Sequence, residues 1–466
     1  MRRFLNSSTR LAVGLILIGA AGYYLLALAG RTLSAESASA VASLYLMANI
    51  VGPGIAIPVE QETNRAISEA RAWGFEQSPI IRHMSRLAGL LMLVAGVVVC
   101  AVSPVLVAGP LHGSWGLLAS LLVCVVSFGT LAVARGVLAG RRQYRGYALT
   151  LILEGATRLA PLAALGVAGI SNAVLYCMVF AFGGAFALIG GCLALWRPGT
   201  DGADEPAEAP TGGARPPVPT LKVLGVGLLQ LLGASLLMQT MANVAPIIVN
   251  TRLHDNAELA AAVAQAFVLT RIPLFLFSPL QSMLMPSLVD SVTRHDRAAV
   301  RSRVTTVMLV LVGIGALGVV GSAALGPTVL RVFFGADADV SRTALAALAV
   351  GTVGLMVMQV LQPALVAAHR HRWVTWSWTA GTAGMFALLF IPGDAVFWAV
   401  TAQIVGPALA IVVAATGLVL YLREPAPGEG AEAAGDRSRT AQGTGAGTAE
   451  SVGAQSAVSA VRRTEP

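Results

Sequence analysis

The chain has 466 residues, of which 56% are hydrophobic and only 12% are charged, and its mean hydropathy is +0.74. This composition excludes a soluble globular domain and indicates a polytopic membrane protein. The formal net charge is +8, but basic residues in such a chain usually lie in cytoplasmic loops. No RNA-reading or DNA-reading pattern accompanies them, so no nucleic-acid partner is expected.

Apolar segments long enough to cross a bilayer recur along the chain in two sets of six. The first set is predicted at residues 11–29, 37–58, 87–107, 115–137, 147–168 and 174–196. The second set is predicted at residues 224–249, 259–289, 304–325, 343–367, 373–391 and 396–421. The sequence therefore predicts an all-α membrane protein with about twelve transmembrane helices in two six-helix lobes, residues 1–197 and 221–422.

Two segments lack this apolar character. Residues 198–220 are rich in Pro, Gly and acidic side chains, which predicts a flexible cytoplasmic linker between the lobes. Residues 423–466 contain almost no large apolar side chains, which predicts a disordered cytoplasmic tail. A solvated tail is favoured over a regulatory one.

The basic residues predict the orientation of the chain. If the N-terminus is cytoplasmic, most of the 31 basic residues lie in inner segments or in the tail, and the outer loops contain only Arg31, Arg252, Arg331 and Arg342. This bias predicts a multi-pass protein with both termini cytoplasmic. The preference for Arg over Lys, with abundant Ala and Gly, is typical of a G+C-rich bacterial genome, so the membrane is predicted to be a bacterial cytoplasmic membrane.

The two predicted lobes look related in sequence. Placing Glu36 over Glu258 aligns two similar seven-residue segments and puts Asn49 at the position of Arg271. The match is short and rich in Ala, so chance competes with it. Together with the six-and-six arrangement, it favours a parallel pseudo-repeat with a cavity between the lobes.

The eighth predicted span carries Arg271 close to its middle, and Pro273 and Pro279 interrupt the same helix. An arginine at bilayer depth costs roughly 2.5 to 3.5 kcal/mol on insertion scales, so it should face protein, water or an anionic ligand. We interpret Arg271 as a cationic contact in a central cavity. The alternative is a structural pair with a carboxylate or with helix-end carbonyls.

The fifth predicted span contains Glu154 and, four residues later, Arg158. At this spacing the two side chains share a helix face and can pair. One hypothesis is a self-neutralising structural pair. The other is that Arg158 binds an anionic head group while Glu154 holds it in place or titrates during transport.

Further candidates are polar or helix-breaking residues inside spans. Proline and glycine in the second span predict a broken or bent helix, which often marks the site of a transporter; these residues are Gly52, Pro53, Gly54 and Pro58. Amides in the second, seventh and eighth spans could bind sugar hydroxyls or join neighbouring helices; they are Asn49, Gln230, Gln239, Asn243 and Gln281.

No catalytic set accompanies these residues. The sequence has no Ser/His/Asp arrangement and no P-loop, and the four cysteines lie inside apolar segments at no metal-like spacing, so they are interpreted as small core hydrophobes. We therefore expect neither an enzyme nor a metal or other cofactor.

Four segments, in this order along the predicted spans, resemble the multidrug/oligosaccharidyl-lipid/polysaccharide (MOP) exporter superfamily, which contains Wzx-like polysaccharide flippases, peptidoglycan lipid flippases and MATE pumps. The segments are Pro58-Val59-Glu60-Gln61-Glu62 with Arg65, residues 134–142 with Tyr144 and Tyr147, Thr270-Arg271-Ile272-Pro273, and Leu325-Gly326-Pro327 with Phe333-Phe334-Gly335. The resemblance covers nearly all of residues 1–422.

This resemblance implies a MATE/MurJ-like architecture in which two bundles rock between inward-open and outward-open states. The implied cargo is a polyprenyl-diphosphate-linked oligosaccharide for surface polysaccharide, with its diphosphate on cavity arginines and its lipid tail in the bilayer. Arg271 matches a basic residue common in the eighth helix of the family, Arg158 matches less well, and Asn49 departs from it. Implied partners are membrane lipids and a polysaccharide polymerase or glycosyltransferases.

The chain lacks the extra pair of helices that peptidoglycan lipid flippases commonly carry, which argues against a lipid II cargo. Two alternatives remain: a MATE-like drug/cation antiporter, which would favour acidic residues in the N-terminal lobe, and a non-transporting membrane scaffold of a polysaccharide assembly complex.

Overall fold

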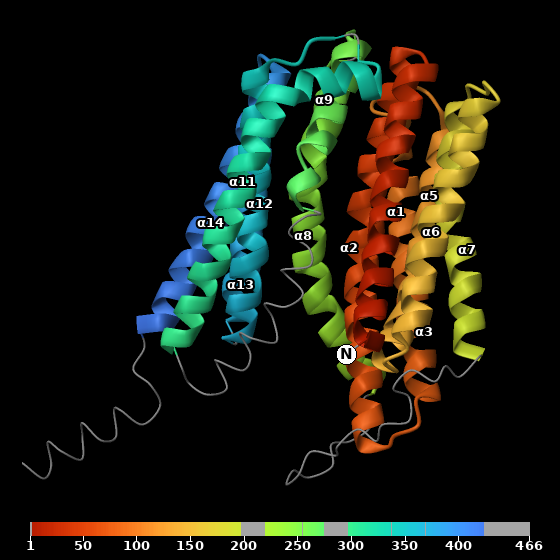
Figure 1. Cartoon of the computed structure of the whole chain (residues 1–466), viewed down its shortest axis with the longest axis vertical. Helices are drawn as coiled ribbons and strands as arrows, with labels where there is room; N and C mark the ends of the chain where they lie inside the picture. Colours follow the sequence, from red (N-terminus) through yellow and green to blue (C-terminus); the bar gives the residue numbers. More distant parts are fainter. Residues whose placement is uncertain are drawn as a thin grey trace, which may run out of the picture. The chain divides into compact units, whose positions relative to one another are not determined.

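The computed structural model describes residues 2–196, 220–253, 255–274, 297–336, 338–368 and 370–423, and the regular elements in these ranges are helices (Figure 1). The helices before the predicted linker are α1 (Arg2–Thr32), α2 (Ala35–Trp73), α3 (Ser78–Ala101), α4 (Ser103–Ala108), α5 (Trp115–Gly140), α6 (Tyr144–Val167) and α7 (Ala173–Trp196). Those after it are α8 (Leu221–Arg252), α9 (Ala257–Leu269), α11 (Arg297–Phe334), α12 (Arg342–Ala367), α13 (His371–Leu389) and α14 (Ala395–Arg423).

Eleven helices of the described residues are long and apolar enough to cross a membrane. The prediction of an all-α membrane protein is confirmed. The helix that is missing from the eleven is α13, which occupies the predicted eleventh span. Its 19 residues begin with His371 and Arg372 and include three tryptophans, so it lacks an apolar stretch as long as those of the eleven.

The helix α2 is continuous over 39 residues, from its N-cap at Ser34 to Gly74 in a left-handed conformation. Residues 52–54 and Pro58 therefore do not break this helix, and a bend at these residues stays a prediction. The glycines serve close packing instead, because a Cβ at Gly52 would lie 2.5 Å from the Phe128 ring and one at Gly54 would lie 2.7 Å from Leu236. Small residues that allow such approach are typical of helix contacts in membranes.

The helix α9, in contrast, ends at Leu269 in mid-span. Thr270 is the C-cap of this helix. The backbone N–H of Arg271 donates to the carbonyl of Val268, three residues earlier, as in a turn. Pro273 has no N–H with which to bond the carbonyl of Leu269, and a proline disfavours helical geometry in the residue before it. Arg271 therefore lies just beyond a helix C-terminus, where the helix dipole favours a cation.

The first helix after the predicted linker, α8, packs along α2. Near one end of α8, Leu224 and Leu228 share an apolar core with Val59 of α2, and near the other end Asn250 bonds Ser39 of α2. Figure 1 shows α8 and α9 between the group α1–α7 and the group α11–α14. Polar side chains on α8 and after α9 are thereby placed where the two groups meet.

Two of the four cysteines, Cys124 and Cys177, are buried, as the sequence predicts. The other two, Cys100 and Cys192, are exposed. The interpretation of all four as core residues is wrong for this pair, because apolar character in a membrane helix does not distinguish a core-facing from a lipid-facing side chain.

The described residues up to Leu418 form one compact unit, and the unit that begins at Val419 is described only as far as Arg423. Most of the predicted linker, the tail beyond Arg423, Pro279 and Gln281 lie outside the described residues. The predicted division into two lobes stays a prediction.

Candidate functional site

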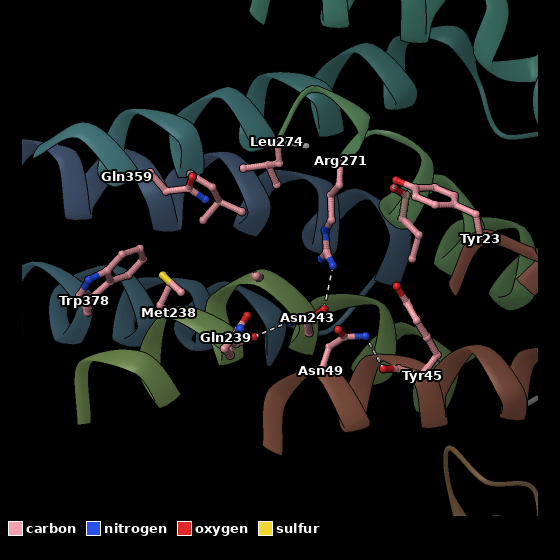
Figure 2. Close-up of a pocket in the computed structure, with 13 residues that line it drawn as sticks. Tyr23, Tyr45, Asn49, Met238, Gln239, Asn243, Arg271, Leu274, Gln359 and Trp378 are labelled. Atoms are coloured by element: carbon pink, nitrogen blue, oxygen red, sulfur yellow. Dashed lines mark hydrogen bonds between the residues drawn. The ribbon is translucent and has the colours of Figure 1, made fainter. Parts of the chain in front are cut away.

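A cavity of about 190 Å³ lies where α1 and α2 meet the later helices (Figure 2). Its lining is composed of aromatic, amide and aliphatic side chains around a single cation. The lining residues are Tyr23, Tyr45, Asn49, Met238, Gln239, Ala242, Asn243, Val268, Arg271, Leu274, Leu355, Gln359 and Trp378. No carboxylate belongs to this described lining.

Arg271 is the cation of this cavity. Its Nη1 donates to Asn243 Oδ1 at 2.7 Å, while its buried Nη2 has no hydrogen-bond partner among the described residues. A hydrogen bond between membrane helices contributes about 0.6 kcal/mol on average, which is less than the roughly 2.5 to 3.5 kcal/mol cost of an arginine at bilayer depth. An anionic ligand could accept a hydrogen bond from this guanidinium nitrogen.

Two asparagines beside Arg271 are each held by their own helix. Asn243 Nδ2 donates to Gln239 O at 2.9 Å, which leaves Asn243 Oδ1 directed at Arg271. Asn49 Nδ2 donates to Tyr45 O at 2.7 Å. In the alignment of the two halves Asn49 takes the position of Arg271, and both residues line this cavity.

The two ends of the cavity differ in chemistry. Figure 2 shows Tyr23 and Tyr45 on one side of the Arg271 guanidinium and Gln239, Gln359, Met238 and Trp378 on the other. Tyr23 donates its hydroxyl to Val268 O at 3.0 Å, and Trp378 donates its indole N–H to Gln362 Oε1 at 2.9 Å. One end thus carries phenols and the other carries amides and an indole.

The structure brings together four of the predicted site residues in this cavity: Arg271, Asn49, Gln239 and Asn243. Gln230 does not join them and is exposed. It precedes Gln239 by nine residues, or about two and a half helical turns, so the two side chains lie on opposite faces of α8. The prediction that places Gln230 in the cavity is wrong for this reason.

Sequence reasoning missed Tyr23, Tyr45, Gln359 and Trp378. Each lies inside a predicted span, and a polar atom on a residue within an apolar segment is a usable signal. The signal is weak because buried Tyr and Trp commonly satisfy that atom within the protein core.

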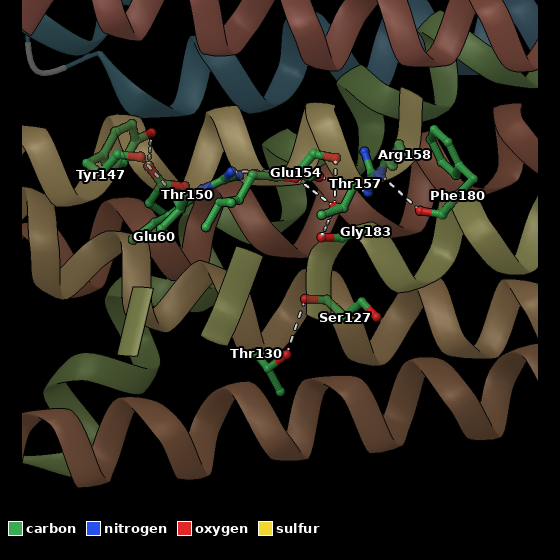
Figure 3. A network of polar contacts seen from close by, with 12 residues as sticks. Glu60, Ser127, Thr130, Tyr147, Thr150, Glu154, Thr157, Arg158, Phe180 and Gly183 are labelled. Atoms are coloured by element: carbon green, nitrogen blue, oxygen red, sulfur yellow. Dashed lines mark hydrogen bonds and ion pairs between the residues drawn. The ribbon is translucent and has the colours of Figure 1, made fainter. Parts of the chain in front are cut away.

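Glu154 and Arg158 lie in a separate polar network (Figure 3). Glu154 Oε1 forms an ion pair with Arg158 Nη2 at 2.8 Å, and Glu154 Oε2 accepts from Arg135 Nη2 at 2.6 Å. Arg135 Nε also donates to Thr150 Oγ1 at 3.0 Å. Each carboxylate oxygen of Glu154 therefore faces one guanidinium, and the pairing favours the structural hypothesis for this residue.

The remaining contacts of the network hold Arg158 away from the cavity. Its Nε donates to Phe180 O at 2.9 Å, and its guanidinium lies 4.2 Å from the centre of the Phe180 ring and 5.2 Å from that of Phe128. Only 2% of Arg158 is exposed. The prediction that Arg158 forms part of the central cavity is wrong, because an ion pair and two aromatic rings enclose its charge.

Sequence reasoning also missed Arg135, since its partner lies on the next helix. Nearby, Tyr147 donates its hydroxyl to Glu60 Oε1 at 2.6 Å. We call Glu60, Arg135, Tyr147, Glu154 and Arg158 the polar network, in which Glu154 and Arg158 are buried and the other three are half-buried. An edge contact between the rings of Phe180 and Tyr45, with centroids 5.7 Å apart, connects it to the cavity wall.

At the predicted outer end of the bundle, Asn250 of α8 is fully buried in a polar cluster. Its Oδ1 accepts from Ser39 Oγ at 2.5 Å and lies 3.1 Å from His112 Nε2, while its Nδ2 donates to Ser43 Oγ at 2.6 Å and to Pro110 O at 3.1 Å. We call these five residues the Asn250 latch. It ties α8 to α2 and to the turn before α5.

A second contact closes the same end. Arg31, at the C-terminus of α1, donates to the carbonyls of Val332 and Phe333 in the last turn of α11. Cations are favoured at helix C-termini, where carbonyls lack intrahelical partners. The helices α1 and α2 are thus joined to α8 and α11 at one end of the bundle.

No family model matches the chain. It is 28% identical over 336 residues to the uncharacterized protein Rv1510 of Mycobacterium tuberculosis (strain ATCC 25618 / H37Rv), covering 71% of this chain and 73% of that protein. It is 25% identical over 414 residues to the uncharacterized protein Rv3630 of the same strain, covering 87% and 90%.

Solved structures with a similar fold are membrane transporters. A structure of the MATE multidrug transporter DinF-BH matches with a TM-score of 0.62 and 14% identity over 90% of this chain and 94% of its own. An inward-facing MATE family transporter of the MOP superfamily matches with a TM-score of 0.60 and 14% identity over 95% and 100%. The lipid II flippase MurJ, inward closed, matches with a TM-score of 0.52 and 10% identity over 88% and 91%.

The fold and the apolar helices define a multi-pass α-helical membrane protein. More particularly, the chain has the fold of the MATE and MurJ transporters of the MOP superfamily, as the sequence resemblance predicts.

Proposed function

We propose that the chain is a transporter that flips a polyprenyl-diphosphate-linked oligosaccharide across the bacterial cytoplasmic membrane by alternating access, for surface polysaccharide biosynthesis. The observation that carries this proposal is Arg271, a cation in a cavity whose described lining has no carboxylate. Its Nη2 is buried and has no described partner. A diphosphate supplies both the negative charge and the acceptor oxygens that this nitrogen needs.

The two ends of the cavity suit the two parts of such a head group. On the phenol side, Tyr45 can donate its hydroxyl to a phosphate oxygen, while the hydroxyl of Tyr23 is already donated to Val268 O. On the other side, Gln239 and Gln359 can bond sugar hydroxyls while the Trp378 indole offers an apolar face to a sugar ring. The polyprenyl chain stays in the bilayer, because its burial there is already favourable.

The size of the cavity bears on the transport step. At about 190 Å³ it is below the roughly 300 to 1,000 Å³ of pockets that enclose a ligand. This volume is too small for an oligosaccharide head group, so transport of such a cargo requires the bundle to open. In our proposal, the Asn250 latch and the Arg31 contact must break when the cavity opens toward the outer side.

The test uses a strain without this gene, complemented by wild type, Arg271→Ala or Gln230→Ala. Lipid extracts are analysed by mass spectrometry for polyprenyl-diphosphate oligosaccharides. We expect one such species to accumulate in the deletion strain and in Arg271→Ala, and to fall to the normal level with wild type and with Gln230→Ala, whose exposed side chain lies outside the cavity. No accumulation, with surface glycans intact, would overturn the proposal.

A MATE-like drug/cation antiporter is the second candidate, and the similarity of fold to MATE structures favours it. A cationic drug requires a carboxylate near its site. In the described residues, Glu154 is held by two arginines and Glu60 by Tyr147, and neither lines the cavity. Drug susceptibility that rises in the deletion strain, without accumulation of a lipid-linked saccharide, would favour this candidate.

The proposed partners are the enzymes that make and use the cargo, glycosyltransferases and a polysaccharide polymerase. A non-transporting scaffold of such a complex is distinguished by mutation of the arginines. Arg271→Ala would leave polysaccharide export unchanged in a scaffold, because a scaffold does not use the cavity, and Arg158→Ala would do the same provided that the protein still folds.

A further inference from the structure

A second concave site lies on α3, α5 and α7, apart from the central cavity. The helices α3 and α7 each pack against α5, which leaves a groove with α5 as its floor and the other two helices as its walls. The groove has a volume of about 440 Å³. Its lining is largely apolar and includes Ala88 and Met92 of α3, Val133 and Val137 of α5, and Leu188 and Cys192 of α7.

One end of this groove carries positive charge. Arg141 lines it from the position just after the last residue of α5, and its Nε donates to Gln77 Oε1 at 2.8 Å. Arg141 forms no ion pair within the described part of the chain, and the lining contains no carboxylate. Arg82 and Arg86, both exposed, each follow a lining residue of α3. Basic pockets between transmembrane helices at the membrane surface bind the head groups of anionic lipids.

The length of the groove matches one leaflet of a bilayer. From Arg141 to Thr130 the lining follows α5 for eleven residues, which is about 16 Å at the rise of an α-helix. Half of the hydrocarbon core of a bilayer is about 15 Å. An acyl chain that starts at Arg141 therefore reaches the bilayer midplane at the far end of the groove.

We propose that this groove binds one anionic phospholipid, with its phosphate on Arg141 and one acyl chain along α5. The charge at the mouth selects an anionic head group over a zwitterionic one. The site shares no lining residue with the central cavity, so the proposal does not depend on the identity of the transported cargo.

The first test is native mass spectrometry of the purified full chain, titrated with phosphatidylglycerol or with phosphatidylcholine of the same acyl chains. We expect wild type to bind one phosphatidylglycerol more tightly than phosphatidylcholine, and Arg141→Ala to lose about fivefold in affinity for phosphatidylglycerol, the effect of one basic residue near an anionic lipid surface. Arg141→Lys keeps the charge and should retain most of the affinity. The matched control is Arg372→Ala, an exposed arginine on α13, which should bind as wild type does.

Equal affinity for the two lipids in wild type, or equal losses in Arg141→Ala and Arg372→Ala, would overturn the proposal.

A second measurement needs no variant. Cys192 lines the groove and is exposed, as is Cys100 on α3 beyond the groove, while Cys124 and Cys177 are buried.

In bilayers of phosphatidylcholine with or without phosphatidylglycerol, N-ethylmaleimide should modify Cys192 more slowly when phosphatidylglycerol is present, and Cys100 at an unchanged rate. If phosphatidylglycerol slows both cysteines equally, or neither of them, the groove holds no selectively bound anionic lipid.

Discussion

Two arginines in predicted transmembrane spans, Arg158 and Arg271, have opposite surroundings. Arg158 faces a carboxylate at 2.8 Å and two aromatic rings, and it lies inside the first group of helices. Arg271 faces a neutral amide at 2.7 Å, has no carboxylate partner among the described residues, and lines a cavity. The comparison teaches that a charge within the membrane indicates a binding site when its partners leave the charge uncompensated.

The largest expected effect is on the stability of the protein, and it comes from removing the carboxylate that pairs with Arg158. Glu154→Gln removes the carboxylate that faces both Arg135 and Arg158 and leaves the buried guanidinium of Arg158 without an ion-pair partner among the described residues. Breaking a buried ion pair from one side typically costs about 3 to 5 kcal/mol. We expect a large fall in the thermal unfolding temperature of the purified protein. An unchanged unfolding temperature would show that the network does not stabilise the fold.

A smaller effect is expected at the Asn250 latch. Asn250→Leu leaves the hydroxyls of Ser39 and Ser43 without this partner, a loss of about 1 to 3 kcal/mol for buried polar groups. In our proposal this loss favours the outward-open state. A cysteine placed at Asn49 should then react faster with an impermeant maleimide added from outside.

The control for the latch is Thr251→Val. Thr251 is the next residue of α8, and its hydroxyl bonds Ile247 O within the same helix at 3.1 Å. Equal reactivity of the cavity cysteine in Asn250→Leu and Thr251→Val would argue against a latch.

Arg271, whose charge has no ion pair among the described residues, should be less important for stability. Arg271→Gln keeps an amide that can bond Asn243. We therefore expect it to change the free energy of unfolding by no more than about 1 kcal/mol. Transport should nevertheless be lost. Unfolding and lipid-linked saccharide levels, measured on the same variant, separate the two effects. A destabilisation as large as that of Glu154→Gln would mean that Arg271 is also structural.

The smallest effect distinguishes two glutamines of α8. Gln239→Ala removes a side chain that lines the cavity, whereas Gln230→Ala removes an exposed one. In the complemented deletion strain, we expect Gln239→Ala to clear the accumulated lipid-linked saccharide severalfold more slowly than wild type does. Gln230→Ala should clear it at the wild-type rate. The reverse order would place the saccharide contacts on the other face of α8.

The class of fold is predictable from the sequence because hydrophobic length is a local property. Spans such as α5 and α12 coincide closely with the predicted apolar segments. The helix α2 continues through Pro53 and Pro58, which local reasoning does not predict, and neighbouring helices pack closely against Gly52 and Gly54.

Periodicity decides which candidate residues of one helix share a face, and the spacing of nine between Gln230 and Gln239 already implies opposite faces. Periodicity does not decide which residues of different helices meet. The pairing of Arg135 with Glu154 depends on how two consecutive helices pack. The presence of Tyr23, Tyr45 and Trp378 in one cavity with Arg271 depends on how helices distant in sequence pack together.

The sequence by itself determined that this is an all-α membrane protein with a charged residue in the middle of its eighth span, because apolar length and charge placement are read residue by residue. Only the tertiary structure decided which buried charge is compensated. Compensation depends on distances between side chains of different helices, and these distances separate the Arg158 pair from the open Arg271 site.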